Sequence, residues 1–389
     1  MIIQCTQALL KELGIRQKDV QTLDETETFS ESFIRWHANI VHINRKKAIV
    51  LMNDITRYPI LLYGMKKKDF KKFDVLVLQA IEEALALEGV RQELVKLYLD
   101  QGREFVFAKT ANRKMTAWLN NTVSEAQFMG EHIDESSIIQ PYHSFFTSKL
   151  LQNFFEKDER DYPNERIAEA LRSWYEAVRG NKVDSPLDVE NYVLKVELQL
   201  HGYHIWRKVS VPSSISFKQL HYVIQTVFDW QNYHLHDYTI TRDNEKPLII
   251  IPDYNPEFME YIDEEKFSVM IGQFTRLHEV FPTALEVVYE YDFGDSWEHV
   301  ITLEKVERTD TLEMKFLGGK GERPPEDVGG ESGFERYLAA IHDEHHPDHQ
   351  LFNTWGKEQT EREQTAAQIE RRLRTALRWS SFDHIIYEV

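Results

Sequence analysis

Residues 289–299 read Tyr-Glu-Tyr-Asp-Phe-Gly-Asp-Ser-Trp-Glu-His and predict two β-strands joined by a tight turn. Aromatic and charged residues alternate on both sides of Gly294 and Asp295, which is the period-2 pattern of a half-buried hairpin. Acids, aromatics and a histidine this close together also indicate a functional site. We therefore expect an antiparallel sheet in the second half of the chain, with polar side chains gathered at one of its turns.

The register of this hairpin decides which side chains meet. A two-residue Gly-Asp turn would place Asp292 opposite Trp297. In the same register Glu290 faces His299, and both share a face of the sheet with Asp292. Such a trio predicts a divalent-metal or proton-transfer site. The alternative is structural: Asp292 and Asp295 hydrogen-bond the turn backbone, and His299 caps the strand pair.

Two further polar groups flank the hairpin in the sequence. His234 and His236 are separated by one residue, which would place both imidazoles on one side of an extended segment, as metal ligands from one strand often are. A polar strand face is the alternative for this pair. Downstream, the pair Pro324-Pro325 predicts a stiff extended backbone that positions Glu326 and Asp327. We expect the three stretches to line one pocket.

The rest of the second half predicts more strands and a few helices. Apolar residues at period 2 indicate strands, and apolar residues three and four apart indicate helices. The predicted strands are 193–200, 205–211, 238–241, 285–292, 297–306 and 385–388, and the predicted helices are 216–228, 331–341 and 365–377.

The first half predicts an antiparallel meander followed by helices. Its predicted strands are 33–43, 47–52, 58–63 and 104–107, and its predicted helices are 69–87, 92–99, 114–128 and 166–178. Turn-forming residues at 180–186 then interrupt the pattern. We therefore predict an α+β protein of two domains, 1–180 and 187–389, each with a mainly antiparallel sheet packed against helices.

Charge and cysteine content narrow the classes of function. The 389 residues carry a formal net charge of -18, and residues 1–180 are nearly balanced with 25 Lys and Arg against 26 Asp and Glu. The second half is therefore strongly acidic and should repel phosphate backbones. Cys5 is the single cysteine, so an internal disulfide or a thiolate zinc cluster is excluded. With no apolar run of ~20 residues and no secretory signal, we expect a cytoplasmic protein without membrane contact.

Two basic segments stand out in the first half. Residues 45–47 read Arg-Lys-Lys, and residues 66–72 contain five lysines. Such runs suit nucleic acid or an acidic partner, although they are more commonly solvated turns and helix starts. Nucleic acid is therefore an alternative partner of the first domain.

Several short motifs stand in order along the chain. Those of the second half are Ile205-Trp206-Arg207 with Val211-Pro212, Leu220-His221, Phe228-Asp229-Trp230, His234-Leu235-His236, Tyr291 to Trp297 with His299, and Pro324 to Asp327 with Gly329-Gly330; those of the first half are Met1 to Leu10, Trp36 to Asn39 and Asn53 to Tyr58. With these motifs, residues from about 190 to 380 resemble the Ri-plasmid open-reading-frame-three-like family, some of whose members bear the names of transposon passenger proteins or resolvases. Residues 1 to about 150 resemble a bacterial domain of unknown function that occurs fused ahead of it.

The resemblance implies an α+β fold and association with plasmids or mobile elements. Recombination is not transferred, because a serine recombinase needs an activated serine among arginines and a basic DNA-binding segment. We predict an accessory protein whose second domain is a binding or regulatory module for an unknown small ligand or protein partner. The alternatives are a metal-dependent hydrolase, acting for example on a phosphoester, and a nucleic-acid-binding protein. The expected ligand-binding residues are Asp292, Asp295, Trp297, His299, Glu326, Asp327, Arg207 and His221, and the expected ligands of a divalent metal are His234, His236, Asp292 and His299.

Overall fold

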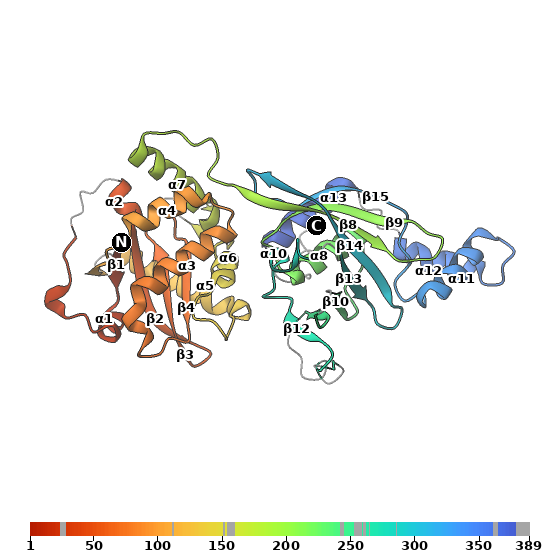
Figure 1. The fold of residues 1–389 in the computed structure, drawn as a ribbon, viewed down its shortest axis with the longest axis horizontal. Coiled ribbons are helices and arrows are strands. Elements are labelled where there is room, and N and C mark those ends of the chain that lie inside the picture. Colours follow the sequence, from red (N-terminus) through yellow and green to blue (C-terminus); the bar gives the residue numbers. More distant parts are fainter. Residues whose placement is uncertain are drawn as a thin grey trace. The chain divides into compact units, whose positions relative to one another are not determined.

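The chain folds into two compact units, each with its own sheet and helices (Figure 1). One unit contains residues 1–189 and 309–312, and the other contains 190–308 and 313–389. Among the described helices none has both the length and the apolar character needed to cross a bilayer. The computed structural model describes residues 1–23, 29–110, 113–150, 152–153, 160–241, 245–252, 259, 262–263, 265–284, 286–360 and 365–378.

The sheet of the first unit has five strands in the order β4-β3-β2-β1-β5. Three of them, β2, β3 and β4, form the predicted antiparallel meander. The short strand β1 was not predicted; it lies between β2 and β5 and is parallel to both. The sheet is therefore mixed. Its strands are β1 (Ile2–Cys5), β2 (Arg35–Ile43), β3 (Lys46–Asn53), β4 (Pro59–Tyr63) and β5 (Val106–Lys109).

Helices cover both faces of this sheet. The larger core lies on the face that buries Trp36, Ala38 and Leu51, and a smaller one on the opposite face buries Val50 and Leu61 against α5. The helices are α1 (Gln7–Leu13), α2 (Phe29–Phe33), α3 (Phe73–Leu87), α4 (Gln92–Gln101), α5 (Arg113–Phe128), α6 (Pro141–Thr147) and α7 (Pro163–Arg179), with 3-10 turns η1 (Gln17–Asp19), η2 (Asp69–Lys72) and η3 (Gly130–His132) and a small hairpin of β6 (Gln152–Asn153) and β7 (Arg160–Asp161).

The second unit is built on an eight-stranded sheet in the order β12-β11-β10-β13-β14-β8-β9-β15. The pair of β11 and β12 is parallel, and the pairs of β8 with β9 and β13 with β14 are antiparallel. The strands are β8 (Val189–Leu198), β9 (Ile205–Pro212), β10 (His236–Ile240), β11 (Leu248–Ile251), β12 (Ser268–Ile271), β13 (Glu286–Tyr291), β14 (Trp297–Thr309) and β15 (Lys315–Lys320).

One long amphipathic helix forms the centre of this unit's core. Helix α8 (Phe217–Phe228) begins at Ser216, whose hydroxyl accepts a hydrogen bond from the Gln219 N–H while the Gln219 side chain accepts one from the Ser216 N–H. Helix α13 (Ala366–Arg378) packs against α8. The remaining helices are α10 (Leu277–Val280), α11 (Gly330–His342) and α12 (His349–Thr360).

The α+β class with two units is confirmed by 40% helix and 27% strand in two sheets packed against helices. The predicted helices and strands of the described residues appear in the structure as the predicted types. The predicted edge strand at 385–388 lies outside the described residues.

Candidate functional site

The hairpin of β13 and β14 has a five-residue loop rather than the predicted two-residue turn. Tyr291 pairs with Trp297, so residues 292–296 lie outside the ladder. Asp292 and Ser296 both have left-handed backbone, with φ of 60° and 53°, and the Ser296 N–H donates to the Asp292 carbonyl at 2.6 Å. The predicted register is therefore wrong by one residue, because Asp292 opens the loop and does not pair across the sheet.

That slip moves His299 into the core, away from Asp292. His299 pairs with Tyr289, is fully buried, and its Nδ1 lies 2.9 Å from the Trp297 carbonyl. The Trp230 indole N–H donates to its Nε2 at 3.4 Å, and burial lowers the pKa of His299 to about 4. Both nitrogens of His299 have partners, and the structure does not bring this predicted metal ligand to the group at His234. Trp297 is likewise a core residue, stacked against Trp230.

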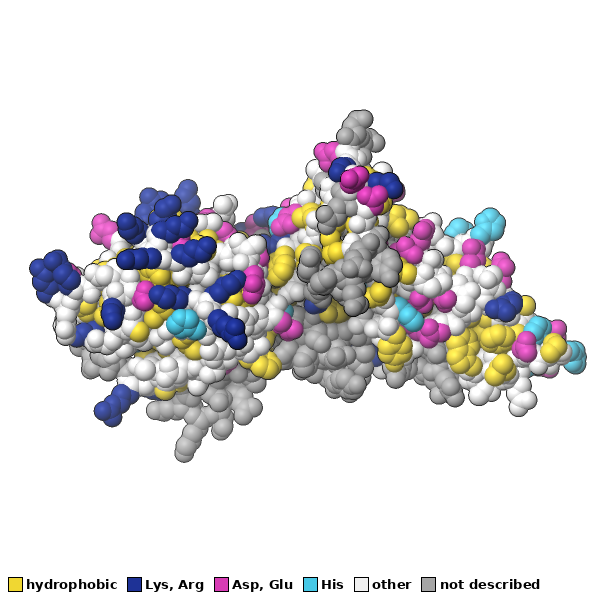
Figure 2. Space-filling view, turned by 90° about the horizontal axis from the view of Figure 1, so that it is seen from below, with side chains coloured by type: hydrophobic (Ala, Val, Ile, Leu, Met, Phe, Trp, Pro, Cys, Tyr) yellow, Lys and Arg dark blue, Asp and Glu magenta, His cyan; other side chains and the backbone are white. Residues whose placement is uncertain are grey.

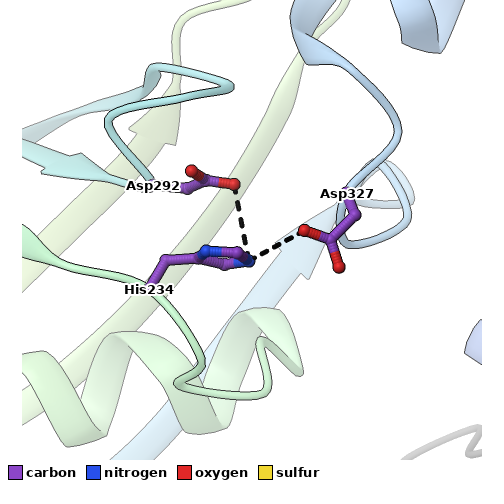
Figure 3. Close-up of side chains that lie close together, drawn as sticks. All are labelled: His234, Asp292 and Asp327. Atoms are coloured by element: carbon purple, nitrogen blue, oxygen red, sulfur yellow. Dashed lines mark ion pairs between the residues drawn. The ribbon is translucent and has the colours of Figure 1, made fainter.

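Three segments that are distant in the sequence meet beside the loop (Figure 3). His234 precedes β10, Asp292 follows β13, and Asp327 lies three residues before α11. The Nε2 of His234 lies 3.1 Å from Asp327 Oδ1 and 3.5 Å from Asp292 Oδ2. One ligand atom from each residue can be chosen so that all three lie within 4.8 Å of one another. The structure thus brings these three predicted residues together.

The contacts of His234 Nε2 are not those of ordinary hydrogen bonds. The atom is shielded from solvent, and within the described part of the chain no partner meets hydrogen-bond geometry. The two carboxylates are at ion-pair distance but at unsuitable angles. A buried polar atom without a hydrogen bond costs about 1–3 kcal/mol, so the arrangement suits an atom that receives a further ligand.

The two acids are held by strained backbone. Asp292 and Asp327 have φ of 60° and 56°, a region that non-glycine residues rarely adopt. Asp292 Oδ1 accepts the Gly294 N–H at 3.0 Å, whereas Oδ2 faces His234. One oxygen of Asp292 thus fixes the turn, as the structural alternative predicts, and the other is directed to His234. The Asp292 side chain is 9% exposed and the Asp327 side chain 65%.

Asp295 connects this loop to the segment that carries Asp327. Its Oδ2 accepts the Gly329 N–H at 3.0 Å. A Cβ on Gly330 would lie 3.0 Å from the Asp295 carbonyl oxygen, so the two backbones are in close approach. Asp295 is therefore a positioning residue between the two loops, 292–296 and 326–330.

Glu326, the residue before Asp327, is buried and holds the segment that precedes His234. It is 1% exposed, and its Oε1 accepts the Gln231 N–H at 2.5 Å and the Tyr291 hydroxyl at 3.3 Å. The same hydroxyl accepts the Tyr233 N–H at 3.0 Å. Burial raises the pKa of Glu326, and its Oε2 has no hydrogen bond within the described chain. The linking role of Tyr291 was not predicted, because its alternation with polar residues indicates only a core aromatic.

The predicted ligand His236 belongs to the core of the second unit. It starts β10 and stacks on His221, with ring centroids 3.5 Å apart and planes 3° apart. His221 Nδ1 lies 2.8 Å from the Tyr289 hydroxyl, and its Nε2 lies 2.6 Å from Asn232 Oδ1. Burial lowers the pKa of His221 to about 3 and that of His236 well below its usual value. His236 is separated from His234 because the strand begins only at His236.

Arg207, predicted as a ligand-binding residue, holds backbone carbonyls. Its guanidinium donates to the carbonyls of Val227 at 2.8 Å and Lys320 at 3.0 Å, and it lies over the Phe228 ring. Burial lowers the pKa of Arg207. This predicted residue therefore fixes β15 and the end of α8 and is not among the residues that meet at His234.

Known proteins match the chain in two separate parts. Residues 190–369 match the family of the plasmid pRiA4b ORF-3-like protein, and residues 2–166 match a domain of unknown function (DUF6933). The uncharacterized protein y4hQ of Sinorhizobium fredii (strain NBRC 101917 / NGR234) is 33% identical over 166 residues, which cover 42% of this chain and 78% of the relative.

A solved structure of unknown function is also similar. MM3350 from Methanosarcina mazei Go1 aligns with a TM-score of 0.38 and 28% identity, covering 43% of this chain and 89% of that one. The family matches confirm the resemblance inferred from the sequence. The chain belongs to the plasmid pRiA4b ORF-3-like family, with a DUF6933 domain ahead of the family domain.

Proposed function

We propose that the second unit binds a divalent metal ion through His234, Asp292 and Asp327 and acts as a binding or regulatory module of a plasmid-associated accessory protein. The observation that carries this proposal is the solvent-shielded His234 Nε2, which lies between two carboxylates without a hydrogen bond. The family of the second unit supports the plasmid association.

The spacing of the three ligand atoms supports the same reading. Ligands bound at ~2.1 Å stand about 3.0 Å apart in octahedral and about 3.4 Å apart in tetrahedral coordination. The distance of 3.1 Å from His234 Nε2 to Asp327 Oδ1 falls in this range, and the 3.5 Å to Asp292 Oδ2 is 0.1 Å beyond its tetrahedral end. One imidazole and two carboxylates suit Zn²⁺, Mn²⁺, Fe²⁺ or Co²⁺. The 65% exposure of Asp327 leaves the open side of the site to water or to a partner's ligand.

Metal binding by protein without a histidine tag tests the proposal. We expect near-stoichiometric metal after dialysis against at least one of Zn²⁺, Mn²⁺, Fe²⁺ and Co²⁺, and a rise in the unfolding temperature of the second unit. A metal at 100 times its Kd stabilises a fold by about 2.7 kcal/mol, which corresponds to roughly 5–10 °C for a unit of this size. His234→Ala and Asp292→Asn should abolish both effects.

His345→Ala is the matched control, because His345 is exposed and outside the three-residue group. It should bind metal as the unchanged protein does. Metal binding that survives His234→Ala, or no thermal shift with any of the four metals, would contradict the proposal and leave a module that acts without metal.

A metal-dependent hydrolase, for example a phosphoesterase, is the second candidate. Glu326 favours it, because burial raises the pKa of this carboxyl next to Asp327 and its Oε2 is free of hydrogen bonds within the described chain. A carboxylate with a raised pKa suits a general base, and the metal would lower the pKa of bound water. Turnover of bis(p-nitrophenyl) phosphate by the metal-loaded protein would support the hydrolase, and its absence would favour the binding module.

A further inference from the structure

One end of the first unit carries a continuous basic surface, which goes beyond the proposed metal site. It combines three segments: residues 11–18 around α1 and η1, the β2–β3 hairpin at 45–47, and residues 66–72 leading into η2. The Met65 N–H donates to the Lys47 carbonyl at 3.0 Å, and Lys47 Nζ lies 2.8 Å from Glu12. The three segments therefore lie side by side. Figure 2 shows Lys and Arg side chains gathered over this unit.

The surface consists mostly of exposed lysines with few acidic neighbours. All its cations except the half-buried Lys47 are exposed. Among the described residues, the three segments contain the acids Glu12 and Asp69, and Asp19 and Glu135 pair with two of the cations. The eleven cations are Lys11, Arg16, Lys18, Arg45, Lys46, Lys47, Lys66, Lys67, Lys68, Lys71 and Lys72.

Most of these cations are free to meet an external anion. Arg16 pairs with Asp19, Lys46 with Glu135 and Lys47 with Glu12. No acid among the described residues forms an ion pair with the other eight side chains. Unpaired lysines on a surface attract counterions, and a polyanion that displaces them gains the entropy of their release.

We propose that this basic surface binds the phosphate backbone of nucleic acid. Nine of its eleven cations are lysines, which act as point charges toward phosphate and lack the planar fork with which arginine binds a carboxylate at two points. A protein interface needs an apolar centre. Among the exposed large apolar side chains of the described residues, none lies in the three segments.

The negative charge of the rest of the chain restricts nucleic-acid binding to this surface. The chain as a whole carries a net charge of -18, so a polyanion is repelled except where cations are concentrated. Contacts to phosphates position a nucleic acid but do not read its bases. The surface should therefore bind DNA and RNA duplexes of any sequence with similar affinity and strong dependence on salt.

Fluorescence anisotropy with labelled 30-base-pair DNA and RNA duplexes of mixed sequence tests the proposal on the full chain. We expect binding at 50 mM NaCl, with affinity falling steeply up to 300 mM. Lys66→Ala, Lys67→Ala and Lys68→Ala together remove three phosphate contacts, so affinity near 0.1 M salt should fall by roughly 100-fold or more, and the slope of log K against log salt should flatten by about 3.

The matched control removes three lysines from the second unit: Lys305→Ala, Lys315→Ala and Lys320→Ala. Both triple variants have the same net charge, and the control should keep its affinity. The combined variant Lys66→Arg, Lys67→Arg and Lys68→Arg should also keep its affinity, because it retains the three positive charges. His234→Ala should also bind normally, which separates this test from that of the metal site.

Three results would overturn the proposal. The first is no binding of either duplex at 50 mM NaCl. The second is an equal loss in both triple variants, which would mean that only total charge matters. The third is binding of poly-L-glutamate without binding of either duplex, which would assign the surface to an acidic protein.

Discussion

Replacing Asp237 by Asn should stabilise the second unit at alkaline pH and leave it nearly unchanged at acid pH. Asp237 stands opposite Glu290 on β13, and Glu290 stands opposite Glu298 on β14, so three acids form one row on the sheet. Burial and, to a lesser extent, the charge of Glu290 raise the pKa of Asp237 from 3.8 to about 7. Like charges directly opposite one another destabilise a sheet.

The sign of the effect follows from this raised pKa. The folded protein holds the proton more tightly than the unfolded chain, so stability is complete below the unfolded pKa of 3.8 and is lost as the pH rises to about 7. At about 1.4 kcal/mol for each pH unit, the full loss is at most about 4 kcal/mol. Because Asp237 is only half-buried, solvent screening reduces this to about 2 kcal/mol.

Urea unfolding followed by tryptophan fluorescence measures the difference. Relative to the unchanged protein, Asp237→Asn should gain about 1–2 kcal/mol at pH 8.5 and nearly nothing at about pH 3.5, below the unfolded pKa. Glu290→Gln should give a smaller gain, since it removes only the neighbouring charge and leaves Asp237 buried. A variant whose stability differs from that of the unchanged protein by the same amount at both pH values, or one that is less stable at pH 8.5, would refute the reasoning.

Two further substitutions test how the core and the loops support the site. A Cβ on Gly333 would lie 1.9 Å from the Val328 carbonyl oxygen, so Gly333→Ala should displace the loop of Asp327. We expect it to cost about 1–3 kcal/mol of stability in calorimetry and to weaken metal binding at least tenfold in a titration. Gly130→Ala is the control that should be tolerated, because a Cβ there meets nothing within 4 Å. Ser216→Ala removes the cap of α8 and should lower stability by about 1 kcal/mol in urea while metal affinity stays the same.

The sequence predicts the class of fold and the three segments of the site. It predicts less well which side chains of those segments contact one another. Long periodic segments such as 216–228 show which face is buried, and the structure places that helix at Phe217–Phe228. The hairpin register failed because a left-handed Asp292 opens a five-residue loop, and a one-residue slip exchanges the faces of every side chain. Asp292 thus kept its predicted place beside His234 while His299 moved into the core.

The separation of His234 from His236 shows a second limit. Spacing alone places two histidines on one side of a strand, but only one of them belongs to the strand, which starts at His236. Burial then decides their roles, because His236 stacks on His221 while His234 remains at the loops. Strand ends depend on tertiary contacts such as the Glu326 bond to Gln231, which no local pattern reveals.

The hydrogen bond between Asp295 and the Gly329 N–H has a mechanical consequence. It fastens the turn after β13 to the start of α11, which begins at Gly330. An ion bridging Asp292 and Asp327 would add a second link between this turn and the segment before α11. With two links, the segment could no longer rotate about the single hydrogen bond. Occupancy would then be transmitted as stiffness to α11 and to α12, which packs on it, and a partner that recognises those helices would sense the ion without touching it.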